Sequence, residues 1–179
     1  MRITGGILKG RKVSVPPGTI RPSMDRMRES VFACLGDISG LSFCDIFTGT
    51  GIIALEAASR GAVRIEAVEQ DKLKRKTLLE NVSIAPEMIK CRFMPAELYI
   101  KRAKTSFDII FLDPPFPYQY KWELVSSIAS SAIVSNESRI LIHRPRADYQ
   151  RTEIPGLEKT GVREYGNSIV DFFNFYKKN

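Results

Sequence analysis

Apolar and polar positions alternate along this chain in two kinds of segment. Short, nearly continuous apolar runs occupy residues 41–47, 63–68, 90–94, 107–112 and 139–143, and such runs indicate buried strands. The stretches between them space their apolar residues along one face of a helix, at 52–60, 72–84, 96–102 and 120–132. Strands that alternate with helices predict an α/β fold with a doubly wound, largely parallel sheet. Two last runs, 157–165 and 168–176, flank the turn Tyr165-Gly166-Asn167-Ser168 and predict a closing antiparallel hairpin.

The first part of the chain differs from this alternation. Residues 1–20 combine glycine turns with a short alternating segment, which predicts a β-hairpin or an extended arm. A helix follows, with Ser23 as its N-cap and Gly36 at its end. The apolar stripe of this helix consists of Met24, Met27, Val31 and Leu35. We therefore expect residues 1–38 to form a small N-terminal extension and residues 39–179 to form the main domain.

Positive charge is concentrated in this extension. The chain carries 27 Lys and Arg residues against 20 Asp and Glu residues, a formal net charge of +7. Residues 1–28 contain one acid, Asp25, and the basic residues Arg2, Lys9, Arg11, Lys12, Arg21, Arg26 and Arg28. A clustered positive surface is typical of proteins that bind nucleic acid, and a solvated basic face is the alternative. Because Arg21, Arg26 and Arg28 lie off the apolar stripe, we expect them to face solvent or a ligand.

Composition disfavours several classes of protein. No apolar run approaches the roughly 18 residues of a membrane-spanning helix. Met1-Arg2-Ile3 does not begin a secretory signal peptide. Cys34, Cys44 and Cys91 lack the spacing of a metal site, so we expect reduced, mostly buried thiols and no bound metal. These features predict a cytoplasmic protein that does not associate with membranes.

A glycine turn, Thr48-Gly49-Thr50-Gly51, joins the first strand of the alternating part to its first helix. Glycine lets the backbone approach a ligand closely, and a helix N-terminus presents N–H groups that have no partner within the helix. A turn of this kind between a strand and a helix favours a nucleotide-like ligand.

An acid, Glu69, ends the second strand. At this position a carboxylate suits the two hydroxyls of an adenosine ribose. Glu66 and Asp71 are nearby alternatives, although Glu66 would lie inside the strand and Asp71 can cap the next helix. In that helix, 72–84, we expect the core residues Leu73, Leu79 and Val82.

The fourth apolar run ends in the sequence Asp113-Pro114-Pro115-Phe116. Proline fixes φ and lacks an N–H group, so the two prolines end the strand and stiffen the chain beyond it. The Asp113 carboxylate and the Pro114 carbonyl can each accept one N–H of an amino group, and the Phe116 ring can stack on the base that carries it. An ordinary strand followed by a Pro-Pro turn is the alternative. Two further aromatic residues can extend this platform or simply pack: Tyr118 and Tyr120.

These three features together resemble the class I S-adenosylmethionine-dependent methyltransferases. More narrowly, nearly the whole chain is similar to the small bacterial RsmD family. The matching segments are Arg2-Ile3-Thr4-Gly5-Gly6, Lys9-Gly10-Arg11, Arg21-Pro22-Ser23, Asp25-Arg26-Met27-Arg28-Glu29, Asp45-Ile46-Phe47-Thr48-Gly49-Thr50-Gly51, Leu55-Glu56-Ala57, Ser59-Arg60-Gly61-Ala62, Val68-Glu69, Asn81, Asp113-Pro114-Pro115-Phe116 and Tyr165-Gly166.

The resemblance implies a Rossmann-like sheet and transfer of a methyl group from S-adenosylmethionine to the exocyclic N2 of a guanine in 16S ribosomal RNA. It implies S-adenosylhomocysteine as product and 16S RNA in an assembling small ribosomal subunit as partner. Methyl transfer from a sulfonium requires no metal, and nothing in the sequence demands more than a monomer. The implied catalytic residues are Asp113, Pro114, Pro115 and Phe116. The implied cofactor-binding residues are Asp45, Phe47, Thr48, Gly49, Gly51, Glu69, Gln70 and Ala96. The implied RNA contacts are Arg2, Lys9, Arg11, Lys12, Arg21, Arg26, Arg28 and Tyr118.

Two positions depart from the family's pattern. Where relatives carry Asp or Asn before the helix 96–102, to meet the adenine amino group, this chain has Pro95. Backbone groups around Ala96 would then recognise adenine, with Glu97 as a substitute. Where relatives often carry an acid at the end of the fifth strand, this chain has His143-Arg144, and we expect a structural or phosphate-contacting role for His143.

Three other functions remain open. Methylation of adenine N6 in DNA or RNA uses the same kind of receptor, although those enzymes more often have Asn where this chain has Asp113. A nucleotide- or NAD-binding oxidoreductase would want a third glycine, but Ile52-Ile53-Ala54 follows the turn. A non-catalytic RNA-binding protein of ribosome assembly would use the basic extension but would leave the Asp-Pro-Pro-Phe sequence unexplained.

Overall fold

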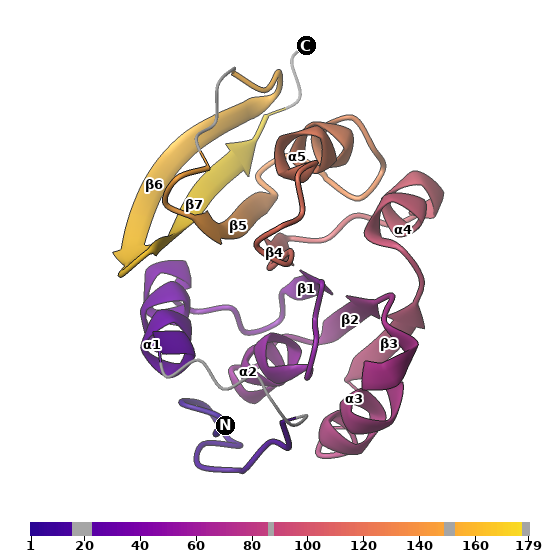
Figure 1. Ribbon diagram of the computed structural model, residues 1–179, viewed down its shortest axis with the longest axis vertical. Helices are drawn as coiled ribbons and strands as arrows, with labels where there is room; N and C mark the ends of the chain where they lie inside the picture. Colours follow the sequence, from indigo (N-terminus) through magenta and orange to yellow (C-terminus); the bar gives the residue numbers. More distant parts are fainter. Residues whose placement is uncertain (16–22, 86–87, 149–152, 177–179) are drawn as a thin grey trace.

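The computed structural model describes residues 1–15, 23–85, 88–148 and 153–176 (Figure 1). Within these residues the chain forms a seven-stranded sheet in the order β3-β2-β1-β4-β5-β7-β6. The first five strands are parallel, and β7 is antiparallel to both β5 and β6, as predicted. The strands are β1 (Ser42–Ile46), β2 (Arg64–Glu69), β3 (Ile89–Phe93), β4 (Ile109–Leu112), β5 (Arg139–Pro145), β6 (Leu157–Tyr165) and β7 (Ser168–Phe175).

Helices cover both faces of this sheet, with α1, α2 and α3 on one side and α4 and α5 on the other (Figure 1). The helical segments are α1 (Ser23–Leu35), α2 (Ile52–Ser59), the 3₁₀ turn η1 (Lys72–Lys74), α3 (Arg75–Val82), α4 (Ala96–Arg102) and α5 (Lys121–Ala129). The doubly wound α/β fold is therefore confirmed. Among the described helices, none is both long and apolar enough to cross a membrane.

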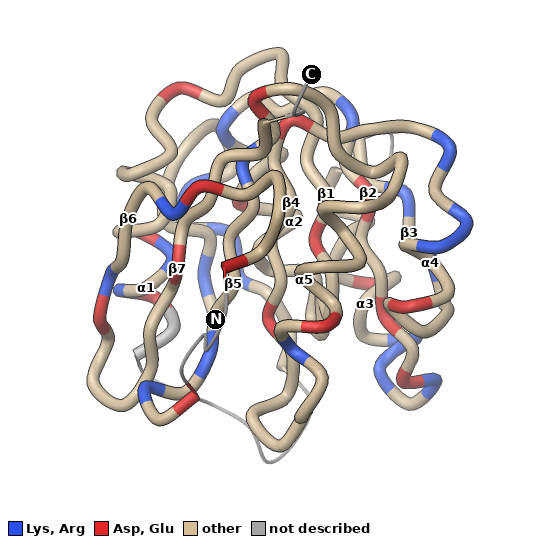
Figure 2. The backbone as a smooth tube through the Cα atoms, turned by 90° about the horizontal axis from the view of Figure 1, so that it is seen from above, with Lys and Arg blue, Asp and Glu red and all other residues tan. Residues whose placement is uncertain are grey.

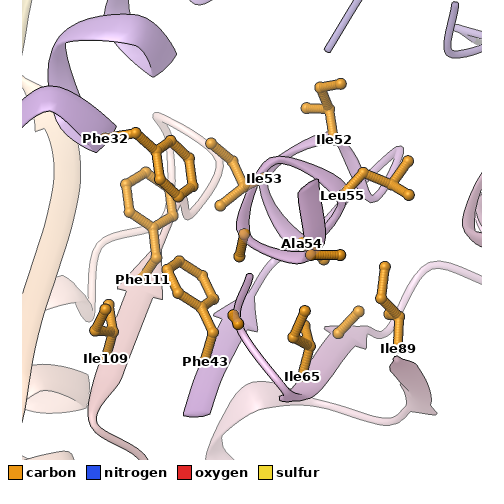
Figure 3. Close-up of a cluster of buried hydrophobic side chains, with 14 of the residues drawn as sticks. Phe32, Phe43, Ile52, Ile53, Ala54, Leu55, Ile65, Ile89, Ile109 and Phe111 are labelled. Carbon is orange, nitrogen blue, oxygen red and sulfur yellow. The ribbon is translucent and has the colours of Figure 1, made fainter. Parts of the chain in front are cut away.

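The core lies between β1, β4 and helix α2. Figure 3 shows Phe43 of β1 and Phe111 of β4 beneath Ile53 of α2. Successive side chains of a strand point to opposite faces, so Cys44 and Ile110 are buried in the second cluster, under α4 and α5. A strand with both faces covered has to be apolar throughout, which explains the continuous apolar runs in the sequence.

The N-terminal segment packs onto the main domain. Residues 1–15 form a hairpin-like arm with an antiparallel bridge between Arg2 and Lys12. The side chains of Ile3 and Val13 join the same hydrophobic cluster as the sheet and α2. Gly6 has a φ of 74°, and a Cβ there would lie 1.8 Å from the Ser59 carbonyl oxygen, so only glycine permits this close approach. The described parts of residues 1–38 thus share a core with the rest of the chain, and their separate role in binding RNA stays a prediction.

The prediction for residues 72–84 is wrong about which leucines are buried. Asp71 accepts a hydrogen bond from the Leu73 backbone N–H at 2.9 Å, as expected of a cap, but the first turn is the 3₁₀ turn η1. The change of periodicity turns Leu73 outward, to 91% exposure, and leaves Leu79 44% exposed. Leu78 takes the buried position instead, and Val82 lies one turn further along the same face.

The three cysteines are free thiols. Cys44 is buried and Cys91 is half-buried, in agreement with the prediction, whereas Cys34 is exposed. Cys34 lies near the end of α1, directly before the buried Leu35.

Candidate active site

The predicted site residues meet at the C-terminal ends of the parallel strands. Asp45 lies near the end of β1, Glu69 is the last residue of β2, and Asp113 follows β4. The Asp113 backbone N–H donates to the Ile46 carbonyl at 3.1 Å, which fixes Asp113 beside the end of β1. His143 lies in the adjacent strand β5. This edge of the sheet is where ligands bind in open α/β folds.

The glycine turn after β1 has an unusual backbone. Phe47, Gly49 and Gly51 have φ values of 67°, 57° and 80°. A left-handed conformation is strained for a residue such as Phe47, and strain of this kind is concentrated at functional sites. Thr48 donates its backbone N–H to the Val68 carbonyl of β2 at 3.0 Å, which anchors the turn between two strands.

A second reason for glycine at position 51 is packing. A Cβ at Gly51 would lie 2.7 Å from Cδ1 of Leu78 in α3. Asn81 of the same helix donates to the Thr50 carbonyl at 2.9 Å and to the Ser14 carbonyl at 3.0 Å. The turn is therefore held by α3 and by the N-terminal arm, a support that the sequence did not predict.

Asp45 is a buried carboxylate in contact with this turn. Its Oδ2 accepts hydrogen bonds from the Thr48 hydroxyl and, at 3.1 Å, from the Ala54 backbone N–H. Its Oδ1 is buried and has no hydrogen-bond partner among the described residues. Burial raises the pKa of Asp45 to about 7, and the negative charge of Asp113 acts in the same direction. A buried carboxylate oxygen without a partner favours a ligand that is cationic or donates a hydrogen bond.

Glu69 is 4% exposed and already participates in the turn. It accepts the Gly49 backbone N–H at 2.9 Å and the Asp71 backbone N–H at 2.8 Å, and Lys74 lies 3.5 Å away. A carboxylate has about four lone-pair sites, so hydrogen bonds to two ribose hydroxyls remain available. The structure confirms the position of Glu69 at the end of β2, and its role in binding ribose stays a prediction.

The alternative acid Glu66 has other partners. It forms a bidentate ion pair with Arg92, with N–O distances of 2.7 and 2.9 Å, and accepts a hydrogen bond from the Tyr99 hydroxyl at 3.0 Å. Burial acts to raise the pKa of Glu66, but the hydrogen bonds from Arg92 and Tyr99 outweigh it and the pKa lies below its usual value. Glu66 is thus part of a structural network and is not placed to replace Glu69.

The segment after β4 is held in place by a buried lysine. Lys121 of α5 is 4% exposed and donates to the carbonyls of Phe116, at 2.8 Å, and Tyr118. Its ammonium group also forms an ion pair with Asp148 at 2.8 Å. Sequence reasoning missed Lys121, although a lone cation at the start of an apolar helix is a signal for such a role. Pro114 itself is buried, and its carbonyl accepts no hydrogen bond from the described residues.

Aromatic rings flank the Asp-Pro-Pro-Phe segment. Phe116 packs edge-on against the His143 ring, with the ring centroids 5.6 Å apart. Tyr118 lies against Phe47 of the glycine turn at 5.4 Å between centroids, and its hydroxyl donates to Glu97. Tyr118, predicted as an RNA contact, is therefore placed on the side of the glycine turn. Tyr120 is 64% exposed and touches Tyr118 by its edge.

The remaining predicted cofactor residues border the same edge. Ala96 is buried in the first turn of α4, and Gln70 is exposed directly after β2. Pro95 precedes α4 with an extended backbone and is exposed. Glu97, considered as a substitute for adenine recognition, is hydrogen-bonded to Tyr118 and would have to share that contact.

The prediction that Arg28 faces solvent or RNA is wrong. Its side chain is fully buried and lies 3.2 Å from Glu56 of α2, with further hydrogen bonds to the Arg2 carbonyl at 2.8 Å and to Asp25 at 2.7 Å. A buried cation is stable only when paired in this way, so Arg28 joins the arm and α1 to α2. Arg21 lies outside the described residues. The exposed basic residues of the extension are Arg2, Lys9, Arg11, Lys12 and Arg26.

His143 and Arg144 lie within β5 and are both buried. Nδ1 of His143 lies 2.7 Å from Oδ1 of Asp113. Arg144 forms an ion pair with Asp171 of β7, a carboxylate that is also paired with Lys159 at 2.7 Å. A structural role is supported for both residues, and the burial of His143 leaves little of its surface for a phosphate.

Comparison with known proteins places the chain in a family. The sequence model of the family described as conserved hypothetical protein 95 matches residues 1–174. The chain belongs to this family. It is 31% identical over 146 residues to ribosomal RNA small subunit methyltransferase D of Escherichia coli K12, covering 79% of this chain and 73% of that protein.

Two further proteins are informative. The solved structure of the protein yhhF from Escherichia coli superposes with a TM-score of 0.89 and 26% identity, over 98% of this chain and 97% of that one. A shorter region of 74 residues is 39% identical to the tRNA1(Val) (adenine(37)-N6)-methyltransferase of Tolumonas auensis, which is 40% of this chain and 31% of that protein. The shared fold thus extends over nearly the whole chain.

Proposed function

We propose that this protein transfers a methyl group from S-adenosylmethionine to the exocyclic N2 of a guanine in 16S ribosomal RNA. The observation that carries the proposal is the pair of acceptors after β4, the Asp113 carboxylate and the Pro114 carbonyl, beside the glycine turn of β1. Membership of the family and the similarity to a ribosomal RNA small subunit methyltransferase support ribosomal RNA as the substrate.

The residues at the strand ends fit S-adenosylmethionine. Asp45 Oδ1 is a buried acceptor without a partner among the described residues, which suits the ammonium group of the amino acid moiety. Gly49 and the strained Phe47 belong to a turn whose backbone can approach the ligand closely. Glu69 retains free lone pairs for the ribose hydroxyls, and the first backbone N–H groups of α4, around Ala96, are open to adenine.

The bound cofactor would supply a methyl group on a sulfonium centre. The neutral thioether is a good leaving group, so transfer requires no covalent enzyme intermediate. Asp113 and the Pro114 carbonyl each accept one N–H of the target amine, which orients its nitrogen towards the methyl group. The negative charge of Asp113 also lies opposite a nitrogen that becomes positive during transfer, and such preorganised charge stabilises the transition state. Phe116 provides a face on which a base rotated out of its helix can stack.

The RNA contacts belong to the same proposal. The exposed basic residues of the extension, Arg2, Lys9, Arg11, Lys12 and Arg26, provide a positive surface for phosphates. None of these residues belongs to the proposed cofactor site, so RNA affinity and cofactor affinity should respond to different substitutions.

Nucleoside analysis tests the proposal directly. Small ribosomal subunits from a strain that lacks this protein are incubated with the purified enzyme and radiolabelled S-adenosylmethionine, and the RNA is then digested to nucleosides. We expect label in N2-methylguanosine. Label in N6-methyladenosine would support adenine methylation, the alternative favoured by the similarity to the Tolumonas auensis enzyme. RNA binding without any incorporated label would support a non-catalytic binder.

A further inference from the structure

His143 is the buried neighbour of the proposed catalytic carboxylate. Its Nδ1 lies 2.7 Å from Asp113 Oδ1, and its side chain is only 5% exposed. Leu112 at the end of β4 is paired with Ile142 of β5, so the sheet register itself places the next two residues, Asp113 and His143, side by side. The contact is built on adjacent strands of the sheet and is therefore rigid.

The hydrogen bonding determines which nitrogen of the ring carries the proton. An ionised carboxylate only accepts hydrogen bonds, so the ring has to present Nδ1–H to Asp113. Nε2 of His143 is buried and has no hydrogen-bond partner among the described residues. A proton on Nε2 would be a buried donor without an acceptor, which is costly. The neutral ring with its proton on Nδ1 is the form that fits this environment.

We propose that His143 is a positioning residue for the methyl-transfer reaction, an inference that rests on the function proposed above. By donating Nδ1–H to Oδ1, it fixes the rotation of the Asp113 carboxylate and leaves Oδ2 to accept an N–H of the target amine. The edge-on contact with Phe116, at 5.6 Å between centroids, also supports the ring on which the base stacks. His143 thus acts through Asp113 and Phe116 and occupies a place where relatives often carry an acid.

Nuclear magnetic resonance can test the tautomer without any ligand. His143 is the only histidine of the chain, so labelling histidine with ¹⁵N reports on a single ring. We expect a protonated Nδ1 and an unprotonated Nε2 in the parent protein, and loss of this preference in the Asp113→Ala variant. A proton on Nε2 in the parent, or the same spectrum in parent and variant, would overturn the assignment.

Kinetics of two matched variants test the positioning role. His143→Phe removes the donor, and we expect kcat to fall roughly 10- to 100-fold, the scale on which a misplaced reacting group lowers a rate. The KM for RNA and the affinity for S-adenosylhomocysteine should stay unchanged. His143→Asn places an amide N–H near the former Nδ1 and should recover most of the lost kcat.

The outcomes separate this inference from the proposed function. If both variants keep the parental kcat, or if His143→Asn fails to recover any of it while remaining folded, His143 does not position Asp113. If the parent protein transfers no methyl group at all, the proposed function fails, whereas the ¹⁵N spectrum still decides whether His143 holds Asp113.

A separate observation concerns a basic groove lined by residues of β2, β3 and α4 and by the segment 102–106. The groove has a volume of about 1070 Å³. Its lining includes Arg64, the first residue of β2, the segment 102–106 that leads into β4, and Val134 ahead of β5. Most of these positions precede the strands, but the lining also includes Met94, which follows β3. None of the active-site residues Asp45, Glu69, Asp113 and His143 lines the groove.

The charge of this groove is unusual for this part of the chain. Residues 29–179 contain 20 Lys and Arg residues and 19 Asp and Glu residues, so they are nearly neutral as a whole. The groove nevertheless has a single acid, Glu66, among the basic residues Arg64, Lys90, Arg92, Arg102 and Lys104. Figure 2 shows Lys and Arg positions along the side of the molecule that carries β3 and α4.

Part of this basic lining is fixed and part is free. Arg92 is held by its bidentate pair with Glu66, and the guanidinium of Arg64 lies 4.3 Å from the ring centroid of Phe107. The other three cations are exposed and form no ion pair with the described residues: Lys90, Arg102 and Lys104. A groove with two fixed guanidinium groups and three free cationic side chains is suited to a chain of phosphates.

We infer that this groove binds the phosphodiester backbone of the RNA, at a contact separate from the methyl-transfer site. Lys90, Arg102 and Lys104 would neutralise phosphates directly. Each phosphate contact releases condensed counterions, so the logarithm of the binding constant changes by about 0.7–0.9 per tenfold change in salt for each contact.

A salt titration with unmodified 16S RNA as the probe tests the groove. The triple variant Lys90→Gln, Arg102→Gln and Lys104→Gln should bind more weakly than the parent, with a salt slope reduced by about 2. Arg92 is left unchanged because its loss would leave Glu66 unpaired. Affinity for S-adenosylhomocysteine should not change.

A control variant removes the same charge elsewhere. Lys72→Gln, Lys76→Gln and Arg163→Gln replace three exposed cations that do not line the groove. We expect this control to keep the parental slope. If the groove variant has the slope of the control, the groove does not bind RNA.

Discussion

Replacing Asp113 with Ala is the most direct perturbation of the proposed chemistry. The change removes one of two acceptors for the target amine and leaves the glycine turn and the basic extension intact. It also leaves the Nδ1–H of His143, in a side chain only 5% exposed, without an acceptor. A buried unsatisfied donor costs about 1–3 kcal/mol of folding stability. For a chain of this size we expect Tm to fall by roughly 2–4 °C per kcal/mol.

The expected loss of rate follows from the charge of the missing group. A hydrogen bond to a charged group contributes about 1.5–3 kcal/mol, and about 1.4 kcal/mol corresponds to a tenfold change in rate. Loss of one preorganised transition-state partner lowers kcat by about 100- to 1000-fold. We therefore expect Asp113→Ala to lower kcat roughly 100-fold, with unchanged affinity for S-adenosylhomocysteine and RNA, because neither ligand depends on this carboxylate for binding.

Asp113→Asn is a sharper probe, because His143 decides which way the amide faces. The Nδ1–H group needs an acceptor, so the Asn oxygen turns to the imidazole and the Asn NH2 group faces the target amine. Two donors then oppose each other, and we expect kcat no higher than in Asp113→Ala. Removing the imidazole frees the amide to rotate, so adding His143→Phe to Asp113→Asn should raise kcat above that of Asp113→Asn alone.

Single-turnover methyl transfer to unmodified small subunits measures these rates, with circular dichroism to confirm folding at the assay temperature. If Asp113→Ala retained the full kcat, the Asp-Pro-Pro-Phe segment would be only a turn and the mechanism would be refuted. If Asp113→Asn were nearly as active as the parent, a negative charge at this position would be unnecessary.

Three further predictions concern ligand binding. Glu69→Gln should weaken S-adenosylmethionine by about 1–3 kcal/mol in calorimetry without affecting RNA, the range for a charged hydrogen bond; an unchanged dissociation constant would remove Glu69 from the cofactor site. Changing Arg11, Lys12 and Arg26 together to Ala should reduce the salt slope of RNA binding by roughly 2–3, and an unchanged slope would make them a solvated face. Burial raises the pKa of Asp45 from 3.8 to about 7, so the folded state binds the proton more tightly than the unfolded state does. The contribution of Asp45 to the free energy of unfolding is therefore greatest below pH 3.8 and is lost as the pH rises through 7. The same ionisation should strengthen binding of S-adenosylhomocysteine, through its ammonium group, from about pH 6 to about pH 8. Asp45→Asn should make that affinity independent of pH, and a pH-dependent variant would assign the effect to another group.

Local sequence signals were enough to predict the order of the elements and the edge of the sheet where the candidate site lies. Apolar periodicity and turn residues are local signals, so the five parallel strands and the closing hairpin were predicted with boundaries close to those observed. Gly36, with a φ of 70°, ends α1, and Asp71 caps the following turn. Because parallel strands place their carboxyl ends at one edge, strand order alone was enough to bring Glu69 and Asp113 together.

Local pattern was insufficient where burial depended on a distant partner. Arg28 has the spacing of an exposed residue on α1, but Glu56, which is far away in the sequence, provides the opposite charge that keeps it buried. The 3₁₀ turn at η1 likewise shifted the buried face of α3 from Leu73 and Leu79 to Leu78. The burial of Arg28 and of Leu78 cannot be predicted from short-range periodicity, because it depends on the residues that pack against each helix.

The way in which the proposed catalytic group is held depends on contacts between distant elements. His143 is separated from Asp113 by 30 positions, and the contact between them comes from the pairing of β4 with β5. Lys121 reaches back to the carbonyls of Phe116 and Tyr118 because α5 packs directly beside the end of β4. A hydrogen bond requires its two atoms within about 3 Å, and for residues on different elements that distance is fixed by sheet register and helix packing, which no single segment of sequence contains.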